Sequence, residues 1–134
     1  MRIVIQRVTQ SEVTIAGRSV GKIGKGMMIL LGVEAEDSDA DIEWLCGKVA
    51  RLRIFDDENG VMNLDVRQVE GEVLVVSQFT LLASTRKGNR PSYIAAAPEA
   101  VSRPMYERFV ERMESLTGRK VATGEFGADM QIEL

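Results

Sequence analysis

The sequence contains no histidine, and this absence excludes more than any other feature of its composition. Without an imidazole, the chain lacks the usual base near neutral pH, the Ser-His-Asp arrangement and the commonest metal ligand. Cys46 is the only cysteine, which excludes internal disulfides and cysteine-based zinc sites and favours a reducing compartment. No apolar run approaches the length of a membrane span, and the N-terminus has no signal-peptide pattern. We therefore expect a cytoplasmic protein with no metal, no other cofactor and no membrane partner.

Linkers and low-complexity tracts are also absent, and 134 residues with 45% apolar and 28% charged side chains are typical of one globular domain. Seventeen basic and twenty acidic residues give a net charge of −3, which argues against indiscriminate nucleic-acid binding, so we expect no DNA partner. Acids gather in residues 34–45, whereas residues 73–98 contain Arg86, Lys87 and Arg90 and no acid. These three cations form either a local anion site or an ordinary solvated face.

Branched apolar residues and period-2 alternation predict a series of strands. The first three are expected to form a meander, and the fourth, apolar on both faces, a central strand. The predicted strands are Arg2–Val8, Glu12–Ile15, a short strand through Ile23, Met27–Val33, Arg53–Phe55, Val61–Leu64, Val73–Leu82 and Asp129–Leu134. The acidic turn at 56–60 lacks the ligand pattern of a calcium loop and is interpreted as a solvated hairpin turn.

An apolar stripe at helical spacing predicts a first helix after Ser38, which can cap it. The stripe includes Ile42, Cys46 and Val49. We expect Cys46 and Trp44 to pack in the core, with a reactive thiol as the alternative for the cysteine.

A second stripe predicts a helix over Glu99–Leu116, ended by Gly118. Pro104 leaves two possibilities for its start. Either Ser102 is the cap and Pro104 lies in the first turn, or that turn is distorted.

The predicted strand from Val73 onward becomes polar at Ser77, Gln78 and Thr80, which combine hydroxyls and an amide at a strand-to-loop junction. An unpaired buried polar group costs about 1 to 3 kcal/mol, so the junction calls for a partner. A hydroxyl nucleophile normally needs an adjacent base, and Lys87 could serve only with a strongly lowered pKa. Backbone N–H groups remain available, since each donor aimed at a developing oxyanion contributes roughly 3 to 4 kcal/mol without any titrating side chain.

Six blocks spread over the whole chain carry a more specific signal. They are Met1–Val8, Leu30–Val33, Leu52–Phe55, Ser77–Leu81, Lys87–Ser92 and Gly127–Met130. In this order they resemble the D-aminoacyl-tRNA deacylase family, also called the D-Tyr-tRNA deacylase family. The block Ser-Gln-Phe-Thr-Leu is one of that family's two signatures.

The resemblance implies an α/β (α+β) fold in which two β-sheets roll into a barrel-like core with two outer helices. It also implies a homodimer. The implied activity is hydrolysis of the ester bond of D-aminoacyl-tRNA, and of glycyl-tRNA mischarged on tRNA-Ala, which releases the free amino acid and tRNA. Such an enzyme performs chiral proofreading in translation quality control.

By the same resemblance, Ser77, Gln78, Phe79 and Thr80 belong to the catalytic site. The Phe79 carbonyl would hold the substrate ammonium, and the Thr80 N–H would face the scissile carbonyl. The ribose 2′-hydroxyl of the tRNA would help to activate the attacking water, which suits a chain without histidine. Thr80 as a nucleophile is the alternative to a positioning role.

The substrate implied by the family is an aminoacyl-tRNA. Under this hypothesis, Arg86, Lys87 and Arg90 bind phosphates of the acceptor end and make binding sensitive to salt. The alternative function is a non-catalytic tRNA-binding or assembly module of the same fold.

The sequence departs from the family at its C-terminal end. The second signature, Gly-Pro-Val-Thr, follows the Gly-Ala-Asp-Met block in the family, and its cis Gly-Pro peptide reaches into the partner's site to block L-amino acids. We expect residues 1–134 to form a single deacylase domain that lacks this Gly-Pro segment.

Overall fold

The computed structural model describes residues 1–134, with two α-helices, one 3₁₀ helix and nine strands. The helices are α1 (Asp39–Arg51), η1 (Phe79–Leu82) and α2 (Glu99–Thr117). The strands are β1 (Arg2–Val8), β2 (Ser11–Ile15), β3 (Arg18–Ile23), β4 (Gly26–Gly32), β5 (Phe55–Asp56), β6 (Met62–Leu64), β7 (Glu72–Ser77), β8 (Ala122–Thr123) and β9 (Gln131–Glu133).

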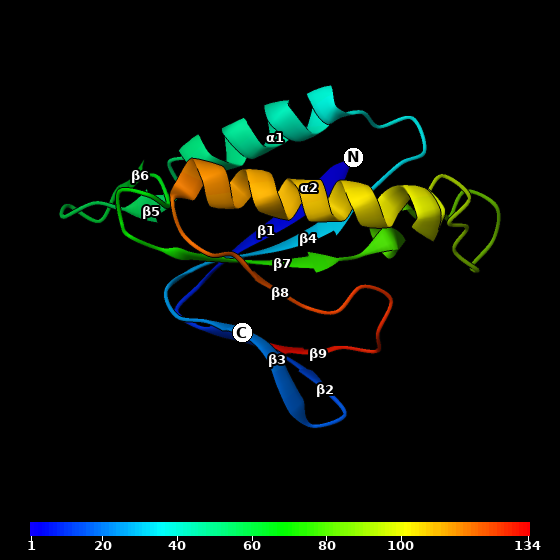
Figure 1. Ribbon diagram of the computed structural model, residues 1–134, viewed down its shortest axis with the longest axis horizontal. Coiled ribbons are helices and arrows are strands. Elements are labelled where there is room, and N and C mark those ends of the chain that lie inside the picture. The colour runs from blue at the N-terminus through cyan, green and yellow to red at the C-terminus, as the bar shows by residue number, and fades with distance from the viewer.

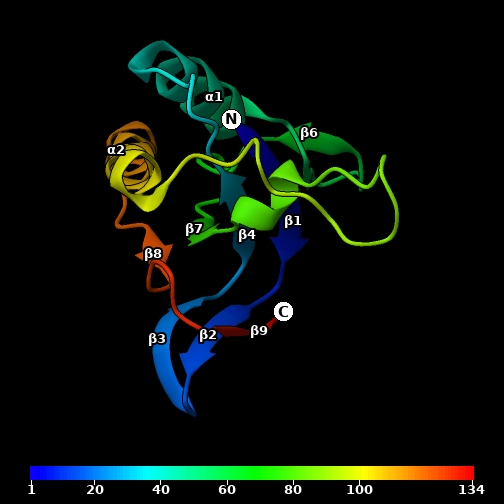
Figure 2. The ribbon, with the colours of Figure 1, turned by 90° about the vertical axis from the view of Figure 1, so that its right-hand side faces the viewer.

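The elements form three layers (Figure 1). A four-stranded sheet has the order β1-β4-β7-β8, in which β1 runs antiparallel to β4 while β7 and β8 continue parallel to it. Both long helices cover one face of this sheet, and the three-stranded sheet β3-β2-β9 lies on its other side (Figure 2). The predicted α/β (α+β) class, with two main sheets and two outer helices, is confirmed, while the rolling of the sheets into a barrel stays a prediction.

The central strand β4 separates two apolar cores. Met27, Ile29 and Leu31 point to the helices and belong to the larger core, whereas Met28 points to the second sheet and belongs to the smaller core. The same alternation continues on β7. The prediction of a central strand covered on both faces is therefore confirmed, because period-2 side chains enter a different core on each side.

Helix α1 begins where its cap was predicted. The Asp41 carboxylate accepts a hydrogen bond from the Ser38 backbone N–H at 2.8 Å, which ties the first turn to the residue before it. Cys46 is fully buried and its thiol donates to the Phe109 carbonyl at 3.6 Å, so its predicted core position is confirmed. The same prediction was wrong for Trp44, which is 66% exposed with Lys48 beside its ring.

Helix α2 begins at Glu99, as predicted, so Ser102 is not its cap. The first turn forms after Pro98, whose carbonyl accepts the Ser102 N–H at 2.9 Å. Pro104 therefore lies inside the helix, where it removes one backbone donor. The predicted stop is confirmed, because Gly118 adopts the left-handed conformation with φ of 70°.

Three other expectations about the strands are corrected. The first three strands do not form a meander, since β1 pairs with β4 while β2 and β3 pair in the other sheet. The strand predicted to reach Leu82 ends at Ser77, and the 3₁₀ helix follows. Strand β8 was not predicted, because two residues are too short to display a period. Strand β9, by contrast, pairs with β2 in the region predicted as the last strand.

Candidate functional site

The candidate site starts where β7 leaves the sheet. Ser77 is the last residue of β7 in register with β4, and the Gln78 N–H donates to the Leu31 carbonyl at 2.7 Å. The chain then tightens, and the Leu81 N–H donates to the Gln78 carbonyl at 3.2 Å. The Arg2 guanidinium donates to the Leu81 carbonyl and so ties the end of this turn to β1.

Because the backbone turns here, the amides of Phe79 and Thr80 lie in the first turn of η1 and not in the sheet. The first N–H groups of a helix have no acceptor within that helix. Among the backbone hydrogen bonds made outside helices and strands, none has either amide as its donor. Sheet pairing ends before both residues. Neither amide is therefore used in sheet pairing.

A cavity of about 330 Å³ opens beside this turn. It lies between the ends of β4 and β7, the first turns of α2 and the segment that leads into β9. The lining residues are Leu31, Val33, Val76, Ser77, Gln78, Phe79, Ala97, Ser102, Tyr106, Phe126, Gly127, Ala128, Asp129, Met130 and Ile132.

Three of the four predicted catalytic residues, Ser77, Gln78 and Phe79, line this cavity. Thr80 is not among its lining residues. The side-chain amide of Gln78 donates to the Thr80 hydroxyl, so the Thr80 hydroxyl is linked to a lining residue. The structure thus brings the four residues together in one short turn and engages the Thr80 hydroxyl in a hydrogen bond.

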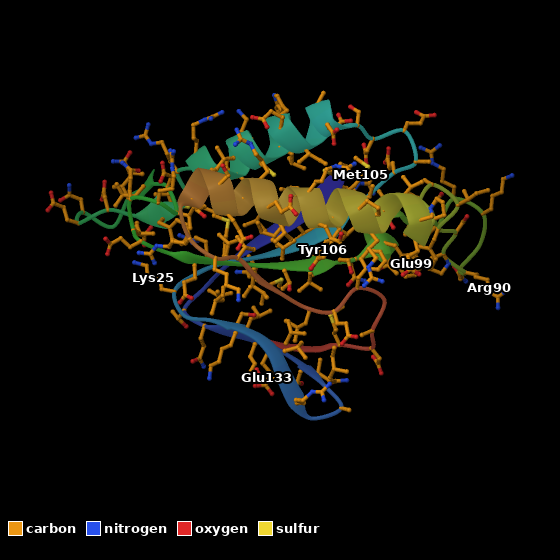
Figure 3. The ribbon with its side chains drawn as sticks, viewed as in Figure 1. Lys25, Arg90, Glu99, Met105, Tyr106 and Glu133 are labelled. Carbon is orange, nitrogen blue, oxygen red and sulfur yellow. The ribbon has the colours of Figure 1, made fainter.

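The opposite wall comes from residues that the sequence analysis did not assign to the site. Tyr106 points from α2 toward the sheet (Figure 3) and donates its hydroxyl to the Val75 carbonyl at 3.0 Å. Phe126 packs on it, with ring centroids 5.7 Å apart, and Arg103 lies over the Phe126 ring. The Gly-Ala-Asp-Met block directly after Phe126 was the one available signal for this wall, since it lies in the same cavity lining.

Two buried groups have a pKa that is raised well above neutral pH. Burial raises the pKa of the Tyr106 hydroxyl to about 12, an effect that the Thr123 hydroxyl partly opposes. Burial, with the Glu43 charge, likewise raises the pKa of the Cys46 thiol to about 12. Cys46 belongs to α1 and lies in the larger core, not in the cavity. Asp129 is the only carboxylate in the cavity lining.

The predicted tRNA-binding residues occupy an exposed loop outside the cavity. Arg86, Lys87 and Arg90 are exposed and form no ion pair. The base of the loop is closed by two backbone hydrogen bonds of 2.8 Å between Ser84 and Ser92. Arg90 points away from the body of the molecule (Figure 3), so these cations are free to meet an anion from solvent.

The acidic turn has its own structural explanation. Asp57 accepts hydrogen bonds from the backbone N–H groups of Asn59 at 2.9 Å and Val61 at 3.1 Å. These bonds hold the pKa of the Asp57 carboxyl below its usual range. The carboxylate therefore shapes the β5–β6 turn.

Known proteins share this sequence and geometry. The sequence profile described as D-Tyr-tRNA(Tyr) deacylase matches residues 4–134. The chain belongs to this family. The D-aminoacyl-tRNA deacylase of Bacteroides fragilis (strain YCH46) is 59% identical over 134 residues, which are all of this chain and 89% of the relative. The protein of the same name from Dechloromonas aromatica (strain RCB) is 54% identical with the same coverage.

Two solved structures agree with the family in fold. A protein named c-Myc DNA Unwinding Element Binding Protein superposes with a TM-score of 0.92 at 36% identity, over all of this chain and 91% of that one. A protein described as a probable eukaryotic D-amino acid tRNA deacylase has a TM-score of 0.85 at 16% identity, over 98% and 91% of the two chains, and it supports the fold alone.

The family confirms the prediction of a D-aminoacyl-tRNA deacylase, which is a carboxylic ester hydrolase. The family indicated by the six sequence blocks, from Met1–Val8 to Gly127–Met130, is therefore the correct one. No helix of this deacylase has both the length and the hydropathy that a membrane crossing requires.

Proposed function

We propose that this chain hydrolyses the ester of D-aminoacyl-tRNA in the cavity beside Phe79, with backbone dipoles in place of an imidazole. One observation carries the proposal: the amides of Phe79 and Thr80 lie at the start of a 3₁₀ helix, past the end of sheet pairing. The chain has no histidine, and the lone cysteine is in the core. Preorganised N–H donors act on a developing oxyanion without any change of protonation.

The reaction is a simple acyl transfer to water. The water oxygen attacks the ester carbonyl carbon, and the carbonyl oxygen becomes an oxyanion that accepts a hydrogen bond from the Thr80 N–H. The bond to the ribose oxygen then breaks, and that oxygen takes a proton, which leaves the free D-amino acid and the tRNA hydroxyl. The Phe79 carbonyl accepts a hydrogen bond from the substrate ammonium, and the ribose 2′-hydroxyl helps to deprotonate the water.

The side chains of the turn have supporting roles in this proposal. Gln78 donates to the Thr80 hydroxyl and so positions the residue whose amide faces the ester. Ser77 and Gln78 line the cavity and provide polar contacts for the aminoacyl-adenosine end. A Thr80 nucleophile is not favoured, because no adjacent base activates its hydroxyl.

Substrate choice in this proposal depends on a second copy of the chain. We propose a cytoplasmic homodimer in which the Gly-Pro segment of the family, where present, blocks the side chain of an L-amino acid. A steric barrier is needed because affinity for one methylene provides only about 10- to 200-fold discrimination. Glycine lacks a side chain, so glycyl-tRNA mischarged on tRNA-Ala is also accepted.

The decisive experiment measures the release of amino acid from D-tyrosyl-tRNA, L-tyrosyl-tRNA and glycyl-tRNA-Ala. It compares residues 1–134 with a version extended by Gly-Pro-Val-Thr at the family's spacing. We expect release from the D-ester and the glycyl ester, and discrimination against the L-ester by the extended version. Failure of both versions to release D-tyrosine would leave the non-catalytic module as the better function.

The name of one structural relative raises DNA as a second partner. We propose that DNA is not a partner, because a net charge of −3 argues against indiscriminate binding of nucleic acid. A duplex DNA competitor added to the D-tyrosyl-tRNA assay should not slow hydrolysis at physiological salt. Inhibition at concentrations that match the tRNA would contradict this.

A further inference from the structure

An exposed aromatic pair consists of Phe79, which lines the cavity, and Tyr93, which contacts it. The rings of Phe79 and Tyr93 meet edge to face, with centroids 5.3 Å apart and an interplanar angle of 78°. Phe79 is 58% exposed and Tyr93 is 37% exposed, although each ring could bury a large apolar area. Ile94, directly after Tyr93, is 92% exposed. We call Phe79 and Tyr93 the aromatic platform.

The aromatic platform is joined directly to the basic loop. Tyr93 follows Ser92, whose backbone pairs with Ser84 and closes the loop that contains the three cations. This loop extends sideways from η1 (Figure 2), at the end of the molecule where β7 stops. No acid occurs in residues 73–98, so the charged side chains of this segment are all positive.

The exposed rings and the three cations together indicate which kind of ligand would bind this surface. A purely apolar partner would gain nothing from three unpaired cations, and a simple anion would gain nothing from two exposed rings. Single-stranded RNA has both unstacked bases, which stack on aromatic side chains, and phosphates, which lysine and arginine neutralise. The acceptor end of a tRNA is single-stranded just before its terminal adenosine.

We infer that the aromatic platform stacks a nucleotide that precedes the terminal adenosine, while Arg86, Lys87 and Arg90 neutralise the adjoining phosphates. This inference rests on the proposed function, which places the aminoacyl-adenosine end in the cavity that Phe79 lines. The strand leaving that cavity then crosses Phe79 and Tyr93 and continues along the loop. The aromatic platform would thus favour an acceptor end whose last nucleotides are single-stranded.

The test compares two esters that differ only in the preceding nucleotides: D-tyrosyl-adenosine and D-tyrosyl-CCA trinucleotide. The variant is Tyr93→Leu, which keeps an apolar contact with Phe79 and removes the π-face. We expect the ratio of kcat/KM for the trinucleotide to that for adenosine to fall by about 5- to 150-fold, the range for one base stacked on an aromatic ring. Tyr93→Phe should restore the ratio.

Trp44→Ala is the matched control, since Trp44 is another exposed aromatic residue but lies on α1, outside the cavity lining. It should leave both esters at wild-type rates. An unchanged ratio in Tyr93→Leu, or an equal fall in Trp44→Ala, would overturn the inference. Conversion of a dimer to a monomer by Tyr93→Leu with an unchanged ratio would overturn it also, and would identify this face as a contact between copies.

A binding measurement separates the inference from the proposed function. If the wild-type chain hydrolyses neither ester, the proposed function fails and the platform is judged by affinity for uncharged tRNA. Wild type should then bind intact tRNA at least about fivefold more tightly than tRNA without its CCA end, and Tyr93→Leu should abolish this difference. Equal affinities for the two RNAs would overturn the inference on its own terms.

Discussion

Thr80 presents two groups near the cavity, a backbone amide and a hydroxyl that accepts a hydrogen bond from Gln78. If the amide carries the chemistry, Thr80→Ala should lower the single-turnover rate on D-tyrosyl-tRNA by about tenfold, because the backbone persists while its positioning contact is lost. Thr80→Ser keeps the hydroxyl and should stay close to wild type. A loss of about 10⁴-fold, or an acyl ester on Thr80 in acid-quenched protein, would instead show a nucleophile.

At the scale of single residues, periodicity predicted more than residue type did. Cys46 lies one turn after Ile42 on the apolar stripe of α1, and both are buried. Trp44 follows Ile42 by two positions, which places it about 200° around the helix axis and on the solvent face. The exposure of Trp44 therefore follows from its position on the helix, although its side chain is hydrophobic.

Among the residues of the site, those in a local motif were predicted and those from distant parts of the chain were not. Ser77, Gln78 and Phe79 were predicted from a local motif and line the cavity. Tyr106 and Phe126 face them from distant parts of the chain. No local pattern reports such a contact, because a buried tyrosine on a helix stripe looks the same whether or not it borders a cavity.

At the scale of elements, the contact between β4 and β7 depends on Gly26. A Cβ at this position would lie against the backbone carbonyl oxygen of Glu72 and 2.6 Å from its nitrogen. Gly26→Ala should therefore lower the free energy of unfolding by about 3 kcal/mol or more in urea titrations, since backbone on both sides must move. At Gly24, the nearest atom is the flexible end of the Glu72 side chain at 3.3 Å, so Gly24→Ala should cost less than about 1 kcal/mol. Equal losses in the two variants would contradict the argument.

The basic loop supports a prediction about salt. Three phosphate contacts contribute a slope of roughly −2 to −3 in log affinity against log salt concentration. Replacement of Arg86, Lys87 and Arg90 together by alanine should therefore flatten the slope for tRNA by about that amount, as measured by filter binding or anisotropy.

The matched control for the basic loop removes three other exposed cations without ion pairs, Arg18, Lys25 and Lys120. Lys25 lies at the opposite end of the molecule from Arg90 (Figure 3). The control changes the net charge equally, so it should leave the slope near that of wild type. A similar flattening in both triple variants would point to overall charge and not to the loop.

Element boundaries were predicted well where a pattern was local, and partners were predicted poorly where pairing was distant. Strand β1 has the predicted bounds, but its partner is β4 and not β2. The polar residues from Ser77 onward were predicted as a continued strand, whereas the backbone turns into η1 once sheet pairing ends. Hydropathy marks which side chains are buried, and it does not specify which strand they lie beside.

At the scale of the whole molecule, the buried Cys46 thiol and Tyr106 hydroxyl predict how the free energy of unfolding varies with pH. Burial raises the pKa of Cys46 from 9.0, and that of Tyr106 from 10.0, to about 12. The unfolded chain loses these protons at lower pH than the folded chain does. Hence the free energy of unfolding should fall between about pH 9 and 12, by about 1.4 kcal/mol per pH unit for each group that titrates only in the unfolded state.

Urea titrations of wild type and Cys46→Ala across this range test the prediction. The variant should be less stable than wild type below about pH 9, because it leaves a small cavity, but it should lose stability less steeply as pH rises, so that the difference between the two proteins shrinks. Parallel pH profiles for the two proteins would exclude Cys46 as one of the titrating groups.

The exposure of Trp44 also has a practical side for anyone who studies this chain by fluorescence. It is the only tryptophan, and most of its side chain is already exposed to water in the native state. The Trp44 emission should therefore shift little on denaturation. It should also respond little to ligand binding at η1, which lies far from Trp44 along the chain. A useful optical reporter must be installed by substitution, for example Tyr93→Trp in a Trp44→Phe background.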